Sequence, residues 1–145
     1  YRYSGLKFSP KPLQTPYPPL LIGGSSTAAR RRVARFGDGW HTLRQSPSQF
    51  ADGRRDIFER VAAAGRDASE LQFSLTLPMR FTGTTPGTPV QDRTALTGTD
   101  DDIVETIKAY QVAGLDEIVV GVSSADPAEN TDAMAHFMKQ VWSKL

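Results

Sequence analysis

Short apolar runs and longer segments of helical periodicity alternate four times along this chain. The short runs, which end at glycine or polar residues, predict strands at residues 20–22, 40–43, 71–79 and 117–122. The segments of helical periodicity, each opened by a capping residue, occupy residues 25–36, 46–65, 99–114 and 126–145. Strands that alternate with helices form parallel sheets with right-handed crossovers. The pattern therefore predicts an α/β fold of four β/α units, which can be a small open sheet or half of a (β/α)8 barrel.

Capping residues and apolar stripes locate the helices more closely. The expected N-caps are Ser25 or Ser26, Ser46, Thr99 and Asp126. The expected buried faces are Phe50, Ile57, Phe58 and Val61 on the second helix, Ile103, Ile107 and Tyr110 on the third, and Met134, Phe137, Met138, Val141 and Leu145 on the fourth. Residues 83–94 have no periodicity, so we expect a loop there.

The first 19 residues contain five of the ten prolines of the chain. Proline removes a backbone donor and breaks helices, so residues 1–19 are expected to be an extended lead-in over a surface. The chain also opens on Tyr1 rather than Met. We therefore expect it to be part of a longer or processed polypeptide.

The composition excludes several classes of function. The chain has no cysteine, which rules out disulfides, thiolate metal sites and thiol catalysis. Its formal net charge of +1 gives no basis for binding nucleic acid or an anionic membrane. Only two histidines are present and no carboxylates are paired at strand ends, so we expect no metal site. No apolar run is long enough to span a membrane, and we expect a cytoplasmic protein.

The turn Gly23-Gly24-Ser25-Ser26 is the best candidate binding site. A phosphate group requires backbone N–H groups that point towards it, no obstructing Cβ, and a helix dipole behind it. Two glycines after a strand and small hydroxyl residues at a helix start meet those requirements. The alternative is an ordinary strand-to-helix turn with a serine cap. The turn has neither the Walker pattern nor the GxGxxG pattern.

Other polar residues are weaker candidates. His41 and Arg44 lie at the carboxyl end of the second strand, and the carboxyl ends of barrel strands carry active sites, so both are candidates for a substrate pocket. The arginines of the first helix point in different directions and predict a solvated face with one or two ion pairs. We expect Asp38 to organise a turn and His136 to have a surface or packing role. No residue is identified as catalytic.

Two stretches carry a resemblance to a known family. They are PPLLIGGSSTAARRRVARFGDGWHT at residues 18–42 and GTDDDIVETIKAYQVAGLDEIVV at residues 98–120. Together with their spacing, they resemble the C-terminal half of luciferase-like monooxygenases, which include deazaflavin-dependent reductases. The resemblance implies that residues 20–145 supply the fifth to eighth strands of a (β/α)8 barrel. It also implies that the turn from Gly23 to Ser26 holds the phosphate of FMN or of the deazaflavin coenzyme F-420.

The resemblance implies an oxidoreductase or monooxygenase acting on a small organic substrate. The cofactor would carry the chemistry, and the protein would position and shield it. The partner is then either a missing N-terminal half or a second copy in a homo-oligomer. A different class of function is a non-catalytic half-barrel that serves as a structural or oligomerisation module. A third is a small α/β domain that binds a phosphorylated ligand other than flavin.

Overall fold

Five parallel strands form one sheet in the computed structural model, which describes residues 2–122 and 124–145. The strands are β1 (Leu21–Gly23), β2 (Gly39–Leu43), β3 (Gln72–Phe81), β4 (Leu96–Gly98) and β5 (Glu117–Val122). The helices are α1 (Thr27–Phe36), α2 (Pro47–Ala63), α3 (Asp100–Val112) and α4 (Pro127–His136). A 3-10 turn η1 (Val90–Asp92) precedes β4, and α4 continues into a π-turn η2 (Phe137–Val141) and a 3-10 turn η3 (Trp142–Lys144). None of the helices in the described part of the chain is long and apolar enough to cross a membrane.

The long central strand β3 organises the sheet. Ser74 pairs with both His41 of β2 and Glu117 of β5, so β2 and β5 lie on opposite edges of β3. Met79 pairs with both Val122 of β5 and Leu96 of β4, which places β4 beyond the end of β2 on the same edge. The four predicted strands and their parallel direction are confirmed. The three-residue strand β4 was not predicted.

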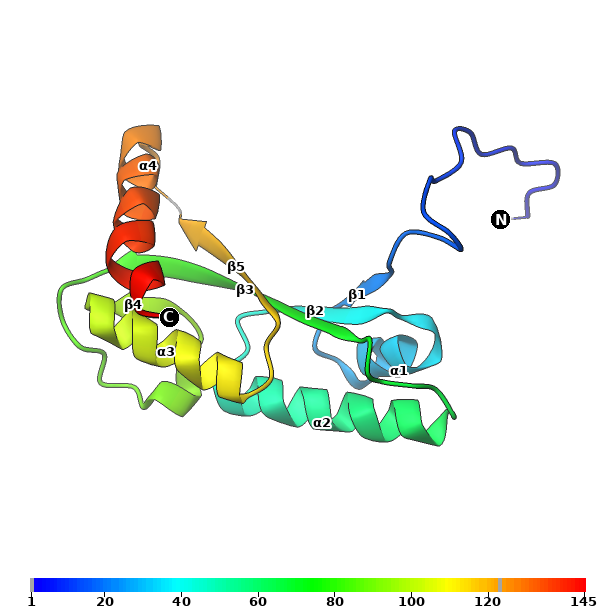
Figure 1. Ribbon diagram of the computed structural model, residues 1–145, viewed down its shortest axis with the longest axis horizontal. Helices are drawn as coiled ribbons and strands as arrows, with labels where there is room; N and C mark the ends of the chain where they lie inside the picture. The colour runs from blue at the N-terminus through cyan, green and yellow to red at the C-terminus, as the bar shows by residue number, and fades with distance from the viewer. Residues whose placement is uncertain (1, 123) are drawn as a thin grey trace.

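Helices α1, α2 and α3 cover one face of the sheet and leave the other face open (Figure 1). The covered face holds the core, in which side chains of β2 and β3 pack against those of α2 and α3. Its largest fully buried side chains include Trp40, Phe50, Phe73, Ile57, Leu75, Leu77, Ile103 and Tyr110. The apolar faces predicted for the second and third helices are confirmed, with Phe58 only partly buried.

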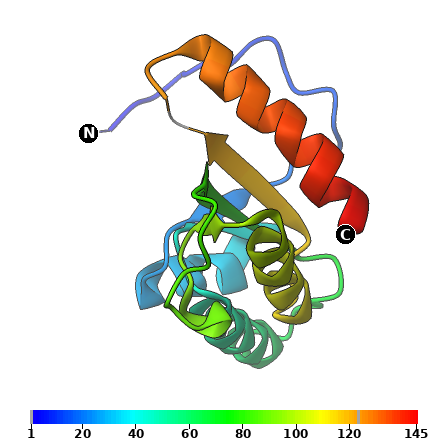
Figure 2. The same ribbon diagram turned by 90° about the vertical axis from the view of Figure 1, so that its left-hand side faces the viewer.

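The apolar face predicted for the last helix is wrong in part. Phe137 and Val141 are buried, whereas Met134, Met138 and Leu145 are exposed. The prediction assumed a continuous α-helix of about 3.6 residues per turn. The π-turn at Phe137–Val141 breaks that period. Figure 2 shows α4 and its continuation running alongside β5. The continuation also contacts α3, where Lys144 pairs with Asp101 at 2.7 Å.

Both outer strands have unpaired edges. Leu21 of β1 is 46% exposed and Val119 of β5 is 42% exposed, although both belong to strands of one sheet. Residues 2–20 contain no helix or strand and extend away from β1 (Figure 1). A parallel sheet normally has both faces covered, so the open face and the two edges belong to an incomplete architecture.

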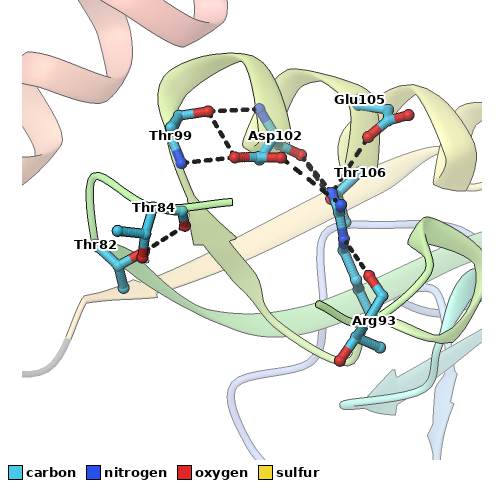
Figure 3. Close-up of polar contacts among 8 residues, drawn as sticks. Thr82, Thr84, Arg93, Thr99, Asp102, Glu105 and Thr106 are labelled. Atoms are coloured by element: carbon cyan, nitrogen blue, oxygen red, sulfur yellow. Dashed lines mark hydrogen bonds and ion pairs between the residues drawn. The ribbon is translucent and has the colours of Figure 1, made fainter. Parts of the chain in front are cut away.

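The segment predicted to be a structureless loop is fixed to α3 by a buried arginine. Arg93 is only 7% exposed and donates hydrogen bonds to the Asp102 carbonyl oxygen at 3.1 Å and to Thr106 Oγ1 at 2.9 Å (Figure 3). The Asp102 carboxylate lies 3.7 Å from the guanidinium. The Tyr110 hydroxyl lies 2.9 Å from the Arg93 carbonyl oxygen and 2.6 Å from that of Gln45. Burial raises the pKa of Tyr110, so the phenol stays neutral and acts as a donor.

Close packing of α2 on the sheet yields the first prediction. A Cβ at Gly53 would lie 2.5 Å from a ring carbon of Trp40, whose ring is stacked on Phe50. Alanine in a helix normally gains about 1 kcal/mol over glycine. Here overpacking against a confined ring costs about 1–3 kcal/mol. We expect Gly53→Ala to lower the midpoint of chemical denaturation, and to cost less when Trp40→Phe is also present. A stabilised Gly53→Ala variant would contradict this packing.

The second prediction concerns acid stability. Asp102 Oδ2 accepts hydrogen bonds from the Thr99 hydroxyl at 2.6 Å and the Thr99 N–H at 2.9 Å, and these bonds lower the pKa of Asp102. The stabilisation is therefore complete above the ordinary aspartate pKa of about 4 and is lost as the pH falls through the lowered value. We expect Asp102→Asn to lower the thermal unfolding midpoint at neutral pH, and the deficit to shrink in acid. Asp101→Asn, which removes an exposed carboxylate on the same turn, is the control.

Candidate functional site

Hydrogen bonds to β2 fix the shape of the turn that follows β1. Gly24 has a φ of +106°, a conformation that favours glycine. Its N–H donates to the His41 carbonyl oxygen at 3.0 Å, and its carbonyl oxygen accepts from Trp40 Nε1 at 2.6 Å. Because Trp40 is fully buried, the turn is tied directly to the core.

The start of α1 combines a serine cap with N–H groups that have no partner. Ser26 is the N-cap, and its Oγ accepts from the Ala29 N–H at 3.2 Å. The preceding backbone N–H groups, from Ser25 to Ala28, have no acceptor among residues 2–122 and 124–145. The ordinary cap is therefore present, and it leaves several donors available at the positive end of a ten-residue helix.

Arg30 links this turn to α2. Its Nη1 donates to the Ser25 carbonyl oxygen at 2.6 Å, and its Nε donates to the Asp56 carboxylate of α2. Arg60 and then Arg30 lower the pKa of Asp56 through hydrogen bonds, so that carboxylate stays ionised. The positive charge of Arg30 is thus paired rather than directed at a ligand. Arg31, Arg32 and Arg35 are exposed, as predicted for a solvated face.

A row of polar residues crosses the open face of the sheet. Gly23, His41, Ser74 and Glu117 are successive register partners on β1, β2, β3 and β5. The His41 ring lies between two hydroxyls, with Nδ1 2.8 Å from Ser74 Oγ and Nε2 3.1 Å from Thr76 Oγ1. Two contacts on opposite sides of the ring hold its orientation.

The structure brings only some of the predicted site residues together. Gly23, Gly24 and His41 are neighbours through the pairing of β1 with β2. Arg44 follows the end of β2, is exposed and has a φ of +49°, with its N–H bonded to the Thr76 carbonyl oxygen. Its predicted place in a substrate pocket stays a prediction.

Ser74 and Thr76 are site residues that the sequence analysis did not single out. A signal for them was present, because the strand at residues 71–79 alternates between apolar and polar side chains. Those polar positions mark the open face. In the described part of the chain, no cluster of three or more His, Asp or Glu side chains can hold a metal ion.

A hollow lies at the carboxyl ends of β3, β4 and β5. Its volume is about 640 Å³, and Arg80, Phe81, Thr97, Val122 and Glu129 are among the residues that line it. His136 packs edge-on against Phe81, with ring centroids 4.5 Å apart, and its Nε2 lies 2.8 Å from Asp100 Oδ1. The predicted packing role of His136 is confirmed.

Comparison with known proteins decides the family. The sequence model of the luciferase-like monooxygenases matches residues 1–85, which is more than half of the 145 residues. The chain belongs to the luciferase-like monooxygenase family. Its sequence is also similar to the FMNH2-dependent dimethylsulfone monooxygenase of Pseudomonas putida, with 38% identity over 65 residues. That match covers 45% of this chain and 18% of the relative.

Solved structures of family members share the fold. A monooxygenase from Streptomyces bottropensis superimposes with a TM-score of 0.73 at 18% identity, over 99% of this chain and 55% of that one. The coenzyme F-420-dependent tetrahydromethanopterin reductase of Methanopyrus kandleri superimposes with a TM-score of 0.68 at 14% identity, over 87% and 50%. The chain therefore has the α/β fold of a (β/α)8 barrel and spans about half the length of these structures.

The turn at the start of α1 yields the third prediction. Ser26 caps the helix, whereas no described residue bonds to the hydroxyl of its exposed neighbour Ser25. Loss of an N-cap costs about 1 kcal/mol. We expect Ser26→Ala to lower the free energy of unfolding by about that amount and Ser25→Ala to leave it nearly unchanged, as measured by urea denaturation. Equal effects of the two substitutions would contradict the assignment of the cap.

Proposed function

We propose that this chain forms the phosphate-binding half of a flavin- or deazaflavin-dependent oxidoreductase that acts on a small organic substrate. The observation that carries the proposal is the set of unpartnered N–H groups from Ser25 to Ala28, at the start of a helix and beside the polar open face. Backbone donors at a helix N-terminus are well suited to a phosphate group.

The residues present fit FMN or coenzyme F-420. Gly23, Gly24, Ser25 and Ser26 would hold the phosphate, since all four are exposed and a Cβ at Gly23 would meet no atom within 4 Å. Among the described residues no carboxylate bonds directly to this turn, and the nearest link is Arg30, which pairs with Asp56. When bound, such a cofactor supplies hydride transfer or the oxidative chemistry of flavin.

The protein itself would orient the cofactor and the substrate and enclose them. His41, held between Ser74 and Thr76, would present a fixed edge to the cofactor ring or the substrate. Arg44 would lie at the mouth of the same pocket, one residue beyond β2. Active sites of (β/α)8 barrels lie at this carboxyl end of the strands.

Four further β/α units would complete the barrel. The unpaired edges of β1 and β5 and the open face of the sheet support this proposal, because a closed barrel has no free edges. The missing units would come from a longer polypeptide or from a second copy of this chain. Cytoplasmic location stays a prediction of the sequence.

The alternative function is a non-catalytic half-barrel that serves as a structural or oligomerisation module. The same open edges favour it, since they can pair with another chain without any cofactor. The two proposals differ in one requirement, because only the enzyme needs the N–H groups before α1 to bind phosphate.

The fourth prediction separates them. We expect FMN or coenzyme F-420 to shift the backbone amide resonances of Ser25, Ser26 and Thr27 saturably, and riboflavin, which lacks the phosphate, to leave these amides unshifted. Ser25→Asp places a negative charge beside these N–H groups, and a negative charge at this position interacts favourably with the dipole of α1. It should weaken FMN binding at least about tenfold. Ala128→Asp, which adds the same charge near the start of α4, should not.

The particle size completes this test. Sedimentation of the chain with and without FMN shows whether a larger, barrel-sized assembly accompanies binding. A stable particle whose amides before α1 respond to neither cofactor would overturn the enzyme proposal and leave the structural module.

A further inference from the structure

A groove between α1 and the end of α2 is lined by five arginines. They are Arg31, Arg32, Arg35, Arg60 and Arg66, and no Asp or Glu is among the described residues that line the groove. The chain as a whole has 17 Lys and Arg residues against 16 Asp and Glu residues, so positive charge is concentrated here rather than spread over the surface. The groove has a volume of about 900 Å³ and belongs to the helix layer that covers one face of the sheet (Figure 1).

The helical period brings three of these arginines onto one side of α1. Arg31, Arg32 and Arg35 fall within about 100° of one another around the helix axis. All three are exposed, and their guanidinium groups form no ion pair with any residue that the structure describes. Arg30 does not belong to this set, because it pairs with Asp56 of α2. The groove therefore carries three positive charges that lack a counter-charge.

The other two arginines are held in place by the fold. Arg60 pairs with Asp56 at 2.9 Å. Arg66 donates hydrogen bonds to the carbonyl oxygens of Ala34 and Gly37 at 2.9 and 2.8 Å, and so satisfies acceptors at the end of α1. These two side chains give the groove a fixed wall opposite the three free arginines.

Apolar surface lies between the charges. Phe36 is 44% exposed and lines the groove together with Ala63 and Ala64 at the end of α2. Helix C-termini carry partial negative charge, which disfavours a compact anion such as free phosphate at this position. The net charge of +1 gives no long-range attraction for nucleic acid. Arginines beside an exposed aromatic ring are instead typical of protein interfaces.

We propose that this groove docks an acidic segment of another protein. Arg31 and Arg35 are four residues apart, which corresponds to about 6 Å along the helix axis. Alternate side chains of an extended peptide are about 6.6 Å apart, so carboxylates at alternate positions can each pair with one guanidinium. The intervening apolar side chains of the segment pack on Phe36 and the neighbouring alanines. The inference is independent of the proposed function, because none of the residues from Gly23 to Ser26 lines the groove.

The experiment measures the fluorescence anisotropy of a labelled probe peptide. Glutamate occupies alternate positions of the probe, and leucine and serine fill the others. A peptide with glutamine in place of glutamate is the neutral counterpart, and a single-stranded DNA oligonucleotide represents nucleic acid. We expect the acidic peptide to bind saturably, with an affinity that falls as salt is added. The other two probes should bind at least about tenfold more weakly.

Variants test the assignment to the groove. Arg31→Gln combined with Arg35→Gln should weaken binding of the acidic peptide at least about tenfold. Phe36→Ala should weaken it by a smaller factor that does not depend on salt, because the lost contact is apolar. Arg55→Gln is the matched control, since Arg55 is an exposed arginine of α2 outside the groove. The double variant should keep the thermal unfolding midpoint, because neither arginine forms an ion pair in the fold.

Four results would overturn the inference. They are equal affinity for the acidic and the neutral peptide, full binding by the double arginine variant, an equal loss in Arg55→Gln, or an oligonucleotide affinity that matches that of the acidic peptide. The last result would assign the groove to nucleic acid instead of a protein segment.

Discussion

The parallel pairing of β1 with β2 is the constraint on which the candidate site depends. Asp38 holds one end of β1, since its N–H donates to the Leu20 carbonyl oxygen and its carboxylate accepts from the Leu20 N–H at 2.8 Å. At the other end, the Gly24 N–H bonds to the His41 carbonyl oxygen. The three-residue strand is thus held at both ends, and the turn that follows it is placed beside His41. Asp38 was expected to organise a turn, whereas its carboxylate bonds to Leu20, the residue before β1.

The two faces of the sheet differ in what they carry. On the helix side, Trp40 packs against Phe50 and Gly53 and leaves no room for an added methyl group. On the open side, the same strands present His41, Ser74 and Thr76. The proposed phosphate site before α1 lies at the carboxyl end of β1, beside this open side.

Two parts of the fold escaped prediction for identifiable reasons. Strand β4 has only three residues, Leu96–Gly98, too few to show a period, and it exists because β3 extends beyond the end of β2. Arg93 lies in a segment of turn residues, where an arginine is normally solvated. It is buried because α3 offers it Thr106 Oγ1 and the Asp102 carbonyl oxygen.

The sequence by itself determined the local structure: four β/α units, the caps at Ser46 and Thr99, a serine cap at Ser25 or Ser26, and the glycine turn after β1. These features depend on residues within a few positions of one another, so periodicity and capping rules suffice to predict them. The tertiary structure alone decided that His41 lies between Ser74 and Thr76 and that Arg30 pairs with Asp56. Such contacts join residues 26 to 35 positions apart, and only the register of the parallel strands and the packing of the helices bring them together.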